Sequence, residues 1–179
     1  MIDRVVCIGG PSGSGKTTVG RKVAEIQGLE FVSAGELFRA EATERGMDLM
    51  AFSLYAVNHE EVDRTLDDRM LASAGPGRLL EGRVSGALCR RRGILSANLA
   101  VTALASVRFA RLARRDGVSL DAARQAAEER ERLEAKRYRA IYGIDLTTET
   151  ADFVVDSTDR SPAAVTDRLL DYLRSLSRS

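Results

Sequence analysis

The chain has 179 residues, of which 44% are hydrophobic and 30% charged, and its net charge is +1. This length and composition fit one globular α/β domain, large enough to bury about 70% of its unfolded surface. Near-neutral charge argues against a general nucleic-acid or membrane-surface binder, and no apolar run approaches the ~18 residues of a membrane span. No charged and then apolar leader opens the sequence, so a cytoplasmic protein is expected.

Cysteine and histidine usage excludes further classes of chemistry. Cys7 and Cys89 are far apart in the sequence and show no C-x-x-C spacing, so we expect reduced thiols rather than a disulfide or a zinc site. The only histidine, His59, lies in a polar, acidic stretch. A histidine-dependent hydrolase triad therefore has no support.

The clearest motif is a glycine-rich loop near the start of the chain. Residues 5–8 predict a strand, and residues 10–17 fit G-x-x-x-x-G-K-[ST], the phosphate-binding loop. Glycine lets backbone N–H groups face phosphate oxygens, while the lysine reaches the β- and γ-phosphates and the threonine hydroxyl binds Mg²⁺. A chance glycine-rich turn is the alternative, but strand, loop and helix occur in the required order. The expected ATP site is Gly10, Pro11, Ser12, Gly13, Ser14, Gly15, Lys16, Thr17 and Thr18.

Strand-like and helix-like segments alternate through the first half of the chain. A helix starts near Lys16 with Val19, Val23 and Ile26 on one face, and Gly28 ends it. The sequence then predicts a strand at 29–33, a helix from about 36 that ends at Gly46, and helices at 48–57 and 59–74. A break follows at 75–77.

The second half continues the alternation. Short strands are predicted at 79–80, 99–104 and 153–155, and residues 90–93 read as a polar loop. Ser106 is expected to cap a helix that ends near Asp116, and Ser119 to cap a long charged helix to about Tyr142. A last helix starts at 161–162. Such alternation predicts a parallel sheet with ligands at the carboxyl ends of its strands.

Polar side chains follow the predicted strands at this edge. Arg39 and Arg83 suit an acceptor phosphate, although surface salt bridging would give the same pattern. Glu81 directly follows a short apolar strand and is the predicted second Mg²⁺ group, ahead of Asp156.

Arginines gather in residues 111–137, the predicted lid. Arg130, Glu134 and Arg137 share one helix face at spacings of four and three. From spacing alone, a solvated Glu/Arg ladder and a functional face are equally good interpretations.

In combination and order, these motifs resemble the cytidylate kinases, particularly their short archaeal-type branch. Beyond the phosphate loop, the resemblance rests on the segments Val32–Arg39, Glu44–Met47, Val62–Asp63 with Leu66–Arg69, Leu80–Arg83, Arg137–Tyr138 with Tyr142–Asp145, and Val155–Thr158. It covers nearly the whole chain. It implies the P-loop NTPase fold, with a five-stranded parallel sheet flanked by helices, and the transfer of phosphate from ATP to CMP or dCMP with Mg²⁺.

The resemblance also implies roles for the arginines. Arg39 and Arg83 would hold the acceptor nucleotide, and Arg111 and Arg115 would clamp the transferred phosphates. A trio that meets the acceptor's sugar and phosphate in the family corresponds to Arg130, Glu134 and Arg137. The expected catalytic side chains are therefore Lys16, Arg111, Arg115 and Arg130.

One nucleoside monophosphate kinase domain is expected over residues 1–179. Its core would be 1–39 and 76–179, with a helical acceptor-binding insertion at about 40–75 and the lid at about 111–137. Small-molecule nucleotides are the expected partners of a monomer. Leu133 and residues 84–98 depart from the family pattern, so a kinase of another acceptor stays open: a modified pyrimidine nucleotide, AMP or a small biosynthetic alcohol. A nucleotide-dependent binding module is the third hypothesis.

Overall fold

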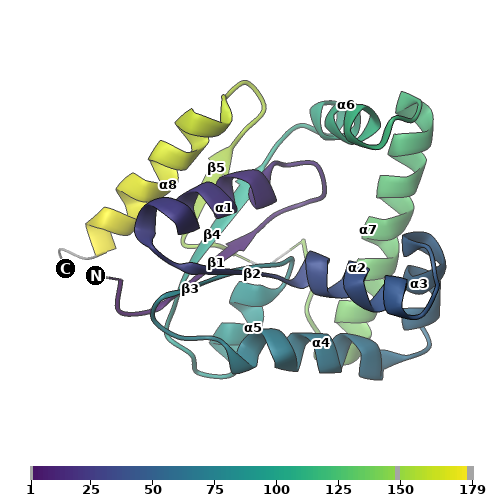
Figure 1. Cartoon of the computed structure of the whole chain (residues 1–179), viewed down its shortest axis with the longest axis horizontal. Coiled ribbons are helices and arrows are strands. Elements are labelled where there is room, and N and C mark those ends of the chain that lie inside the picture. The colour runs from purple at the N-terminus through teal and green to yellow at the C-terminus, as the bar shows by residue number, and fades with distance from the viewer. Residues whose placement is uncertain (1, 148–149, 177–179) are drawn as a thin grey trace.

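The computed structural model describes residues 2–147 and 150–176 of the chain. Its centre is a five-stranded, all-parallel sheet of order β2-β3-β1-β4-β5, as the alternation of strands and helices predicts (Figure 1). The strands are β1 (Val5–Gly9), β2 (Glu30–Ser33), β3 (Arg78–Glu81), β4 (Ser96–Thr102) and β5 (Phe153–Asp156).

Helices cover both faces of the sheet. On one face α1 (Lys16–Gln27) packs against β1, β2 and β3 and α8 (Pro162–Leu176) packs against β5 and α1, and on the other lie α4 (Glu60–Ala72) and α5 (Ser85–Arg91). Residues 5–8 are no more than 1% exposed, because β1 is central and covered on both sides. This explains why β1 reads as a continuous apolar run rather than an alternating one.

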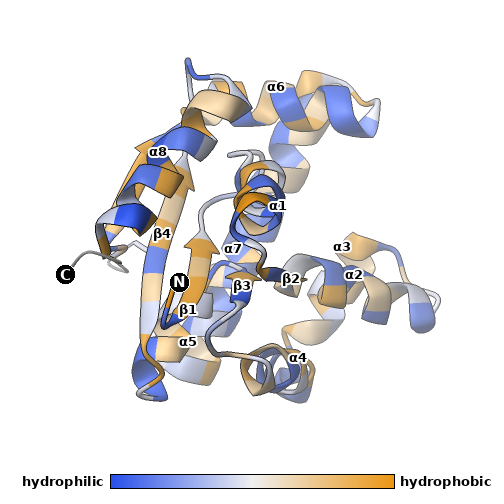
Figure 2. Cartoon of the chain, turned by 60° about the vertical axis from the view of Figure 1, so that its left-hand side comes forward, coloured by the Kyte–Doolittle hydropathy of each residue, from blue (hydrophilic) through white to orange (hydrophobic). Residues whose placement is uncertain are grey.

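The remaining helices stand beside the sheet. A small separate core around Phe52 joins α4 to α2 (Ala34–Glu44) and α3 (Leu49–Ala56). The pair α6 (Ala105–Asp116) and α7 (Leu120–Tyr142) packs through its own small cluster. In Figure 2 the strand β1 is orange, whereas the helices alternate blue and orange as amphipathic helices do. No helix in residues 2–147 or 150–176 combines the length and the apolar composition of a bilayer span.

The fold corrects the prediction for residues 84–104. Helix α5 was not predicted, and it extends to Arg91 in the expected polar loop. Strand β4 begins at Ser96 and ends at Thr102 rather than spanning 99–104, and Ser96 to Asn98 pair with Val5 to Cys7. Three small or polar residues, Ser96, Ala97 and Asn98, open this strand and hide it from a search for apolar runs. Helix α5 contains only seven residues and draws its stability from packing on β1 and β4.

Three smaller predictions were wrong. Helix α6 has Leu104 at its N-cap without a side-chain cap, so Ser106 does not cap it. The second helix already starts at Ala34, because Ser33 caps it. Ile26 is 49% exposed and so does not belong to the buried face of α1, which includes Val19 and Val23. The predicted Ser119 cap is confirmed by its bond from the Ala122 amide.

Two cysteines that are distant in the sequence meet between β1 and α5. Cys7 and Cys89 are buried free thiols whose sulfur atoms lie 3.6 Å apart. The hydrogen bond with Cys89, together with burial, raises the pKa of Cys7 well above its usual value. Linear spacing gave no sign of this contact, because the pairing of α5 with the sheet creates it.

Gly10 is the position where the fold tolerates a side chain least. Its φ is +138°, and a Cβ there would lie 2.1 Å from the backbone carbonyl oxygen of Val101 in β4. We expect Gly10→Ala to lower the free energy of unfolding by clearly more than the ~1 kcal/mol of ordinary positive-φ strain, measured by urea denaturation. Gly117→Ala is the control, because Gly117 also has a positive φ (+67°) but opens into free space. Equal losses in both variants would contradict the close approach.

Candidate active site

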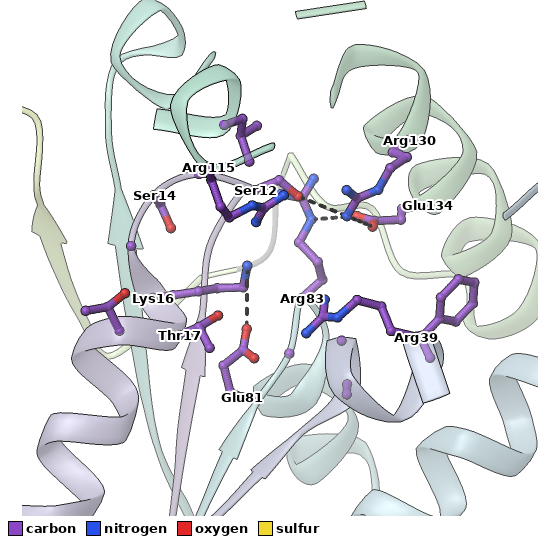
Figure 3. A pocket seen from close by; sticks show the side chains of 18 of the residues that line it. Ser12, Ser14, Lys16, Thr17, Arg39, Glu81, Arg83, Arg115, Arg130 and Glu134 are labelled. Atoms are coloured by element: carbon purple, nitrogen blue, oxygen red, sulfur yellow. Dashed lines mark hydrogen bonds and ion pairs between the residues drawn. The ribbon is translucent and has the colours of Figure 1, made fainter. Parts of the chain in front are cut away.

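The candidate site is a cavity at the carboxyl ends of the strands. Its volume is about 1120 Å³, and it extends from the phosphate loop to α2, α3, α4 and α7. Single small-molecule pockets usually measure about 300–1,000 Å³, so this cavity lies just above that range. Figure 3 shows Lys16, Glu81, Arg39 and Arg83 around one open space.

The predicted phosphate loop forms one end of the cavity. Its residues 12–18 line the cavity, whereas Gly10 and Pro11 lie outside the lining, at the base of the loop. Gly13 and Gly15 have positive φ angles of +77° and +91°, which turn the backbone into helix α1. At Gly13 a Cβ would lie 2.6 Å from the carbonyl oxygen of Arg108, so glycine is also needed for contact with α6.

Lys16 and Glu81 form an ion pair at the centre of the site. Their Nζ and Oε1 atoms lie 3.5 Å apart, and their side chains are 15% and 4% exposed. Burial lowers the pKa of Lys16, and the nearby carboxylate of Glu81 opposes that effect. In this arrangement the lysine is held ready for a phosphate that would supply further negative charge.

The residues fit an ATP site that uses Mg²⁺. Gly13 and Gly15 line the cavity with backbone that carries no side chain, and Thr17 lines the same wall. The Thr17 hydroxyl and the Glu81 carboxylate are hard oxygen donors of the kind that Mg²⁺ prefers, directly or through water. The other acidic candidate, Asp156, is exposed and caps a turn through the Thr158 amide.

Ser33 connects Glu81 to helix α2. Its hydroxyl donates a 2.5 Å hydrogen bond to Oε2 of Glu81 and accepts one from the backbone amide of Glu36. Ser33 is only 3% exposed. One hydroxyl therefore orients the Glu81 carboxylate and caps the helix that carries Arg39.

Arg39 and Arg83 approach the cavity from neighbouring elements. Arg39 lines it and forms no ion pair with any described residue, so surface salt bridging does not account for it. The absence of a side chain at Gly35 leaves room for the Arg39 guanidinium, since a Cβ there would lie 3.3 Å from Nη1. Arg83 lies 3.3 Å from Glu134, at the opposite wall.

The predicted lid arginines divide into two groups. Arg111 contacts the phosphate loop through the Ser14 carbonyl and binds Ser157. Arg130 donates to the Ser12 hydroxyl at 3.4 Å. Arg115 also lines the cavity, but it pairs with its neighbour Asp116 and is 61% exposed.

The Arg130, Glu134 and Arg137 face of α7 does turn toward the cavity. Glu134 lies between Arg83 and Arg130, at 3.3 and 4.0 Å. Arg137 is buried and pairs with Asp63 at 2.8 Å. The spacing left a solvated ladder and a functional face equally plausible, and the structure excludes the solvated ladder.

Several side chains at the site were not singled out from the sequence. Arg108 is 8% exposed, donates to the Ser12 carbonyl at 2.8 Å and pairs with Glu131 at 2.7 Å. Its position three residues before Arg111 was the one available signal, because both lie on the same face of α6. Ser33, Ser157, Asp63 and Asp67 lie in segments that carry the family resemblance, but the sequence assigned no role to them, since their partners come from distant segments.

Comparison with known proteins gives a consistent result. Residues 9–140 match the family model described as AAA domain. A cytidylate kinase from Pyrobaculum calidifontis is 44% identical, with 86% of this chain and 84% of the relative covered. A cytidylate kinase from Methanopyrus kandleri is 41% identical, with 88% and 86% covered. The chain belongs to the cytidylate kinase family. Its resemblance to the archaeal branch is thereby confirmed.

Solved structures support the fold independently. An uncharacterized protein from Eubacterium ventriosum superposes with a TM-score of 0.67 at 16% identity and covers 96% of this chain and 99% of its own. Shikimate kinase from Bacteroides thetaiotaomicron superposes with a TM-score of 0.58 at 17% identity and 96% and 98% coverage. At such identities the similarity concerns the fold alone, which is that of P-loop kinases.

The two departures from the cytidylate kinase pattern lie away from the cavity. Leu133 is buried and does not line it. Residues 84–98 form α5 and the start of β4, and none of them is a lining residue. The departures therefore give no support to a changed acceptor.

Loss of the Ser33 hydroxyl should affect the metal site and a helix cap together. We expect Ser33→Ala to raise the Mg²⁺ concentration needed for half-maximal ATP turnover several-fold and to lower stability by about 1 kcal/mol. Ser33→Thr keeps a hydroxyl and should restore the Mg²⁺ response. Ser161→Ala is the cap control, because its side chain accepts only from the Ala164 amide. An unchanged Mg²⁺ response in Ser33→Ala would show that Glu81 does not depend on Ser33.

Proposed function

We propose that the protein transfers the γ-phosphoryl group of ATP to CMP or dCMP, which gives ADP and CDP or dCDP. The observation that carries the proposal is one cavity with two separate anion grips: the phosphate loop with Lys16, and Arg39 with Arg83. A binding module needs the first grip only. Membership of the cytidylate kinase family supports CMP as the acceptor.

The placement of the side chains around one cavity supports separate roles for the parts of the chain. We assign donor binding to the loop, acceptor binding to the insertion at about 40–75 with Arg39 and Arg83, and closure to the lid at about 111–137. Phosphoryl transfer depends mainly on positioning and on neutralisation of charge. Arginines from α6 and α7 surround the space between the two grips: Arg111, Arg115 and Arg130.

The chain's own residues account for most steps of the proposed reaction. Lys16 stabilises charge on the transferred group, and the loop amides hold the β-phosphate in place. Mg²⁺, held by Thr17 and Glu81, would neutralise the remaining phosphate charge. Glu134 keeps Arg83 and Arg130 extended toward the cavity until an anion replaces it as their partner. A closed lid excludes water and so prevents hydrolysis of ATP.

A panel of acceptors tests the proposal directly. With ATP and Mg²⁺, ADP release should be clearly faster with CMP or dCMP than with UMP, AMP or small alcohols such as shikimate. Lys16→Ala should abolish turnover with no change in the cooperativity of unfolding. A better acceptor than CMP would replace the proposal with a paralogous kinase, and no acceptor-dependent turnover would favour a binding module. The expectations of a cytoplasmic monomer without a nucleic-acid partner stay predictions.

The role of Arg39 can be separated from that of the donor loop. We expect Arg39→Ala to raise the KM for CMP roughly ten- to a hundred-fold, the cost of one charge-assisted contact, and to leave the KM for ATP nearly unchanged. Arg174→Ala is a matched control, since Arg174 is exposed and pairs with Asp171 on α8. Equal rises in both KM values for Arg39→Ala would contradict its assignment to the acceptor.

A further inference from the structure

The end of the cavity farthest from the phosphate loop has a different character. Phe38, Leu49, Met50 and Leu66 provide apolar wall from three helices, α2, α3 and α4. Aromatic and apolar side chains of this kind suit the flat faces of a base. Among them lie two buried carboxylates of α4 that phosphoryl transfer does not use, Asp63 and Asp67.

Helix α7 runs along the cavity from the phosphate loop to α4, so its length gives the distance between these two ends of the cavity. Arg130 contacts the phosphate loop, whereas Arg137 contacts Asp63 on α4. Seven residues separate these positions, which corresponds to about 10 Å along a helix. An acceptor whose phosphate lies by Arg83 and Arg130 would therefore extend its base toward Asp63 and Asp67.

The two carboxylates differ in their partners. Asp63 is neutralised by Arg137, whose guanidinium also donates to the Ser53 carbonyl. Asp67 has no ion-pair partner among the described residues. Its Oδ2 accepts one hydrogen bond, from the Tyr142 hydroxyl at 2.9 Å. Asp67 is 5% exposed and lines the cavity. The Tyr142 hydrogen bond orients its carboxyl group, whose oxygens can still accept further hydrogen bonds from a ligand.

We propose that Asp67 recognises the acceptor base by accepting a hydrogen bond from its exocyclic amino group, and so selects cytosine over uracil. The inference rests on the proposed function for the identity of the ligand. Cytosine carries an amino donor at position 4, where uracil carries a carbonyl oxygen. A carboxylate in a water-poor pocket stabilises the donor and repels the carbonyl, so two bases of equal size are distinguished.

The surroundings of Asp67 are consistent with a site that binds a hydrogen-bond donor of the ligand. Burial raises its pKa to about 7, with further contributions from Asp63 and Asp68, while the Tyr142 hydrogen bond and Arg137 act in the opposite direction. In the free protein this carboxyl is thus poorly solvated, and no described residue forms an ion pair with it. A ligand amino group supplies part of the missing stabilisation.

Asp67→Asn tests the proposal with little change in shape. The amide can donate to the uracil carbonyl, so the ratio of CMP to UMP affinity should fall at least tenfold, measured by calorimetric titration without ATP. The affinity for ATP should not change. Asp68→Asn is the matched control, because the adjacent Asp68 is exposed and pairs with Arg92. It should keep the wild-type ratio.

A second variant covers a possible failure of Asp67→Asn to fold. Tyr142→Phe keeps the carboxylate but removes the hydroxyl that orients it, so the CMP to UMP ratio should fall by a smaller factor. An unchanged ratio in Asp67→Asn, or in Tyr142→Phe where only that variant folds, would overturn the proposal. Measurements of binding and of turnover distinguish a failure of this proposal from a failure of the proposed function. If the wild-type protein binds CMP more tightly than UMP but does not phosphorylate it, the proposed function is contradicted and base recognition by Asp67 is not.

Discussion

The buried contact between Lys16 and Glu81 determines how the rest of the site is arranged. Lys16 begins the helix after β1, and Glu81 ends the neighbouring β3. Ser33 at the end of β2 continues the series by binding Glu81. The ends of three adjacent strands are thus joined through polar side chains. Buried ion pairs add little net stability, so the contact is better explained as a means of fixing the Glu81 carboxylate relative to the loop.

The opposite side of the cavity depends on contacts between α6 and the loop. The backbone of Arg108 lies against Gly13, and its guanidinium joins the Ser12 carbonyl to Glu131 on α7. Glu131 also lies 3.8 Å from Arg83. The start of the proposed lid is therefore attached to the phosphate loop, the proposed donor site. A shift of α6 would move the loop backbone as well, so lid position and donor binding are mechanically connected.

Much of the fold could be predicted because its signals are local. The phosphate loop is contiguous, and the central strand β1 is apolar throughout, so both could be recognised without knowledge of the sheet. Strand β4 shows the limit: Asn98 and its neighbours belong to a strand because β1 and β5 pair with them, and no local pattern records this. The packing of α5 and the Cys7–Cys89 contact depend on the same long-range arrangement.

The residues of the candidate site also divide into those that local sequence signals predict and those that depend on long-range packing. Strand-end placement pointed to Arg39, Glu81 and Arg83, and the structure brings all three to one cavity. Sequence spacing could not show that Arg137 would be buried against Asp63, because the two lie on different helices that meet only in the folded protein. Asp67 lies in a segment that carries the family resemblance, but its contact with Tyr142 of α7 could not be predicted for the same reason. The residues of the phosphate loop were visible in the sequence, whereas the contacts that join separate helices were not.

The lowered pKa of Lys16 has a consequence for the energetics of nucleotide binding. Burial disfavours its charged form in the free protein, with only the nearby carboxylates of Glu81 and Glu134 to oppose it. Phosphate oxygens beside the ammonium group would restore the pKa toward its ordinary value. Binding is then linked to proton uptake under alkaline conditions. The heat of binding would consequently vary with the ionisation enthalpy of the buffer, and affinity would decline as the pH passes the pKa of the free lysine.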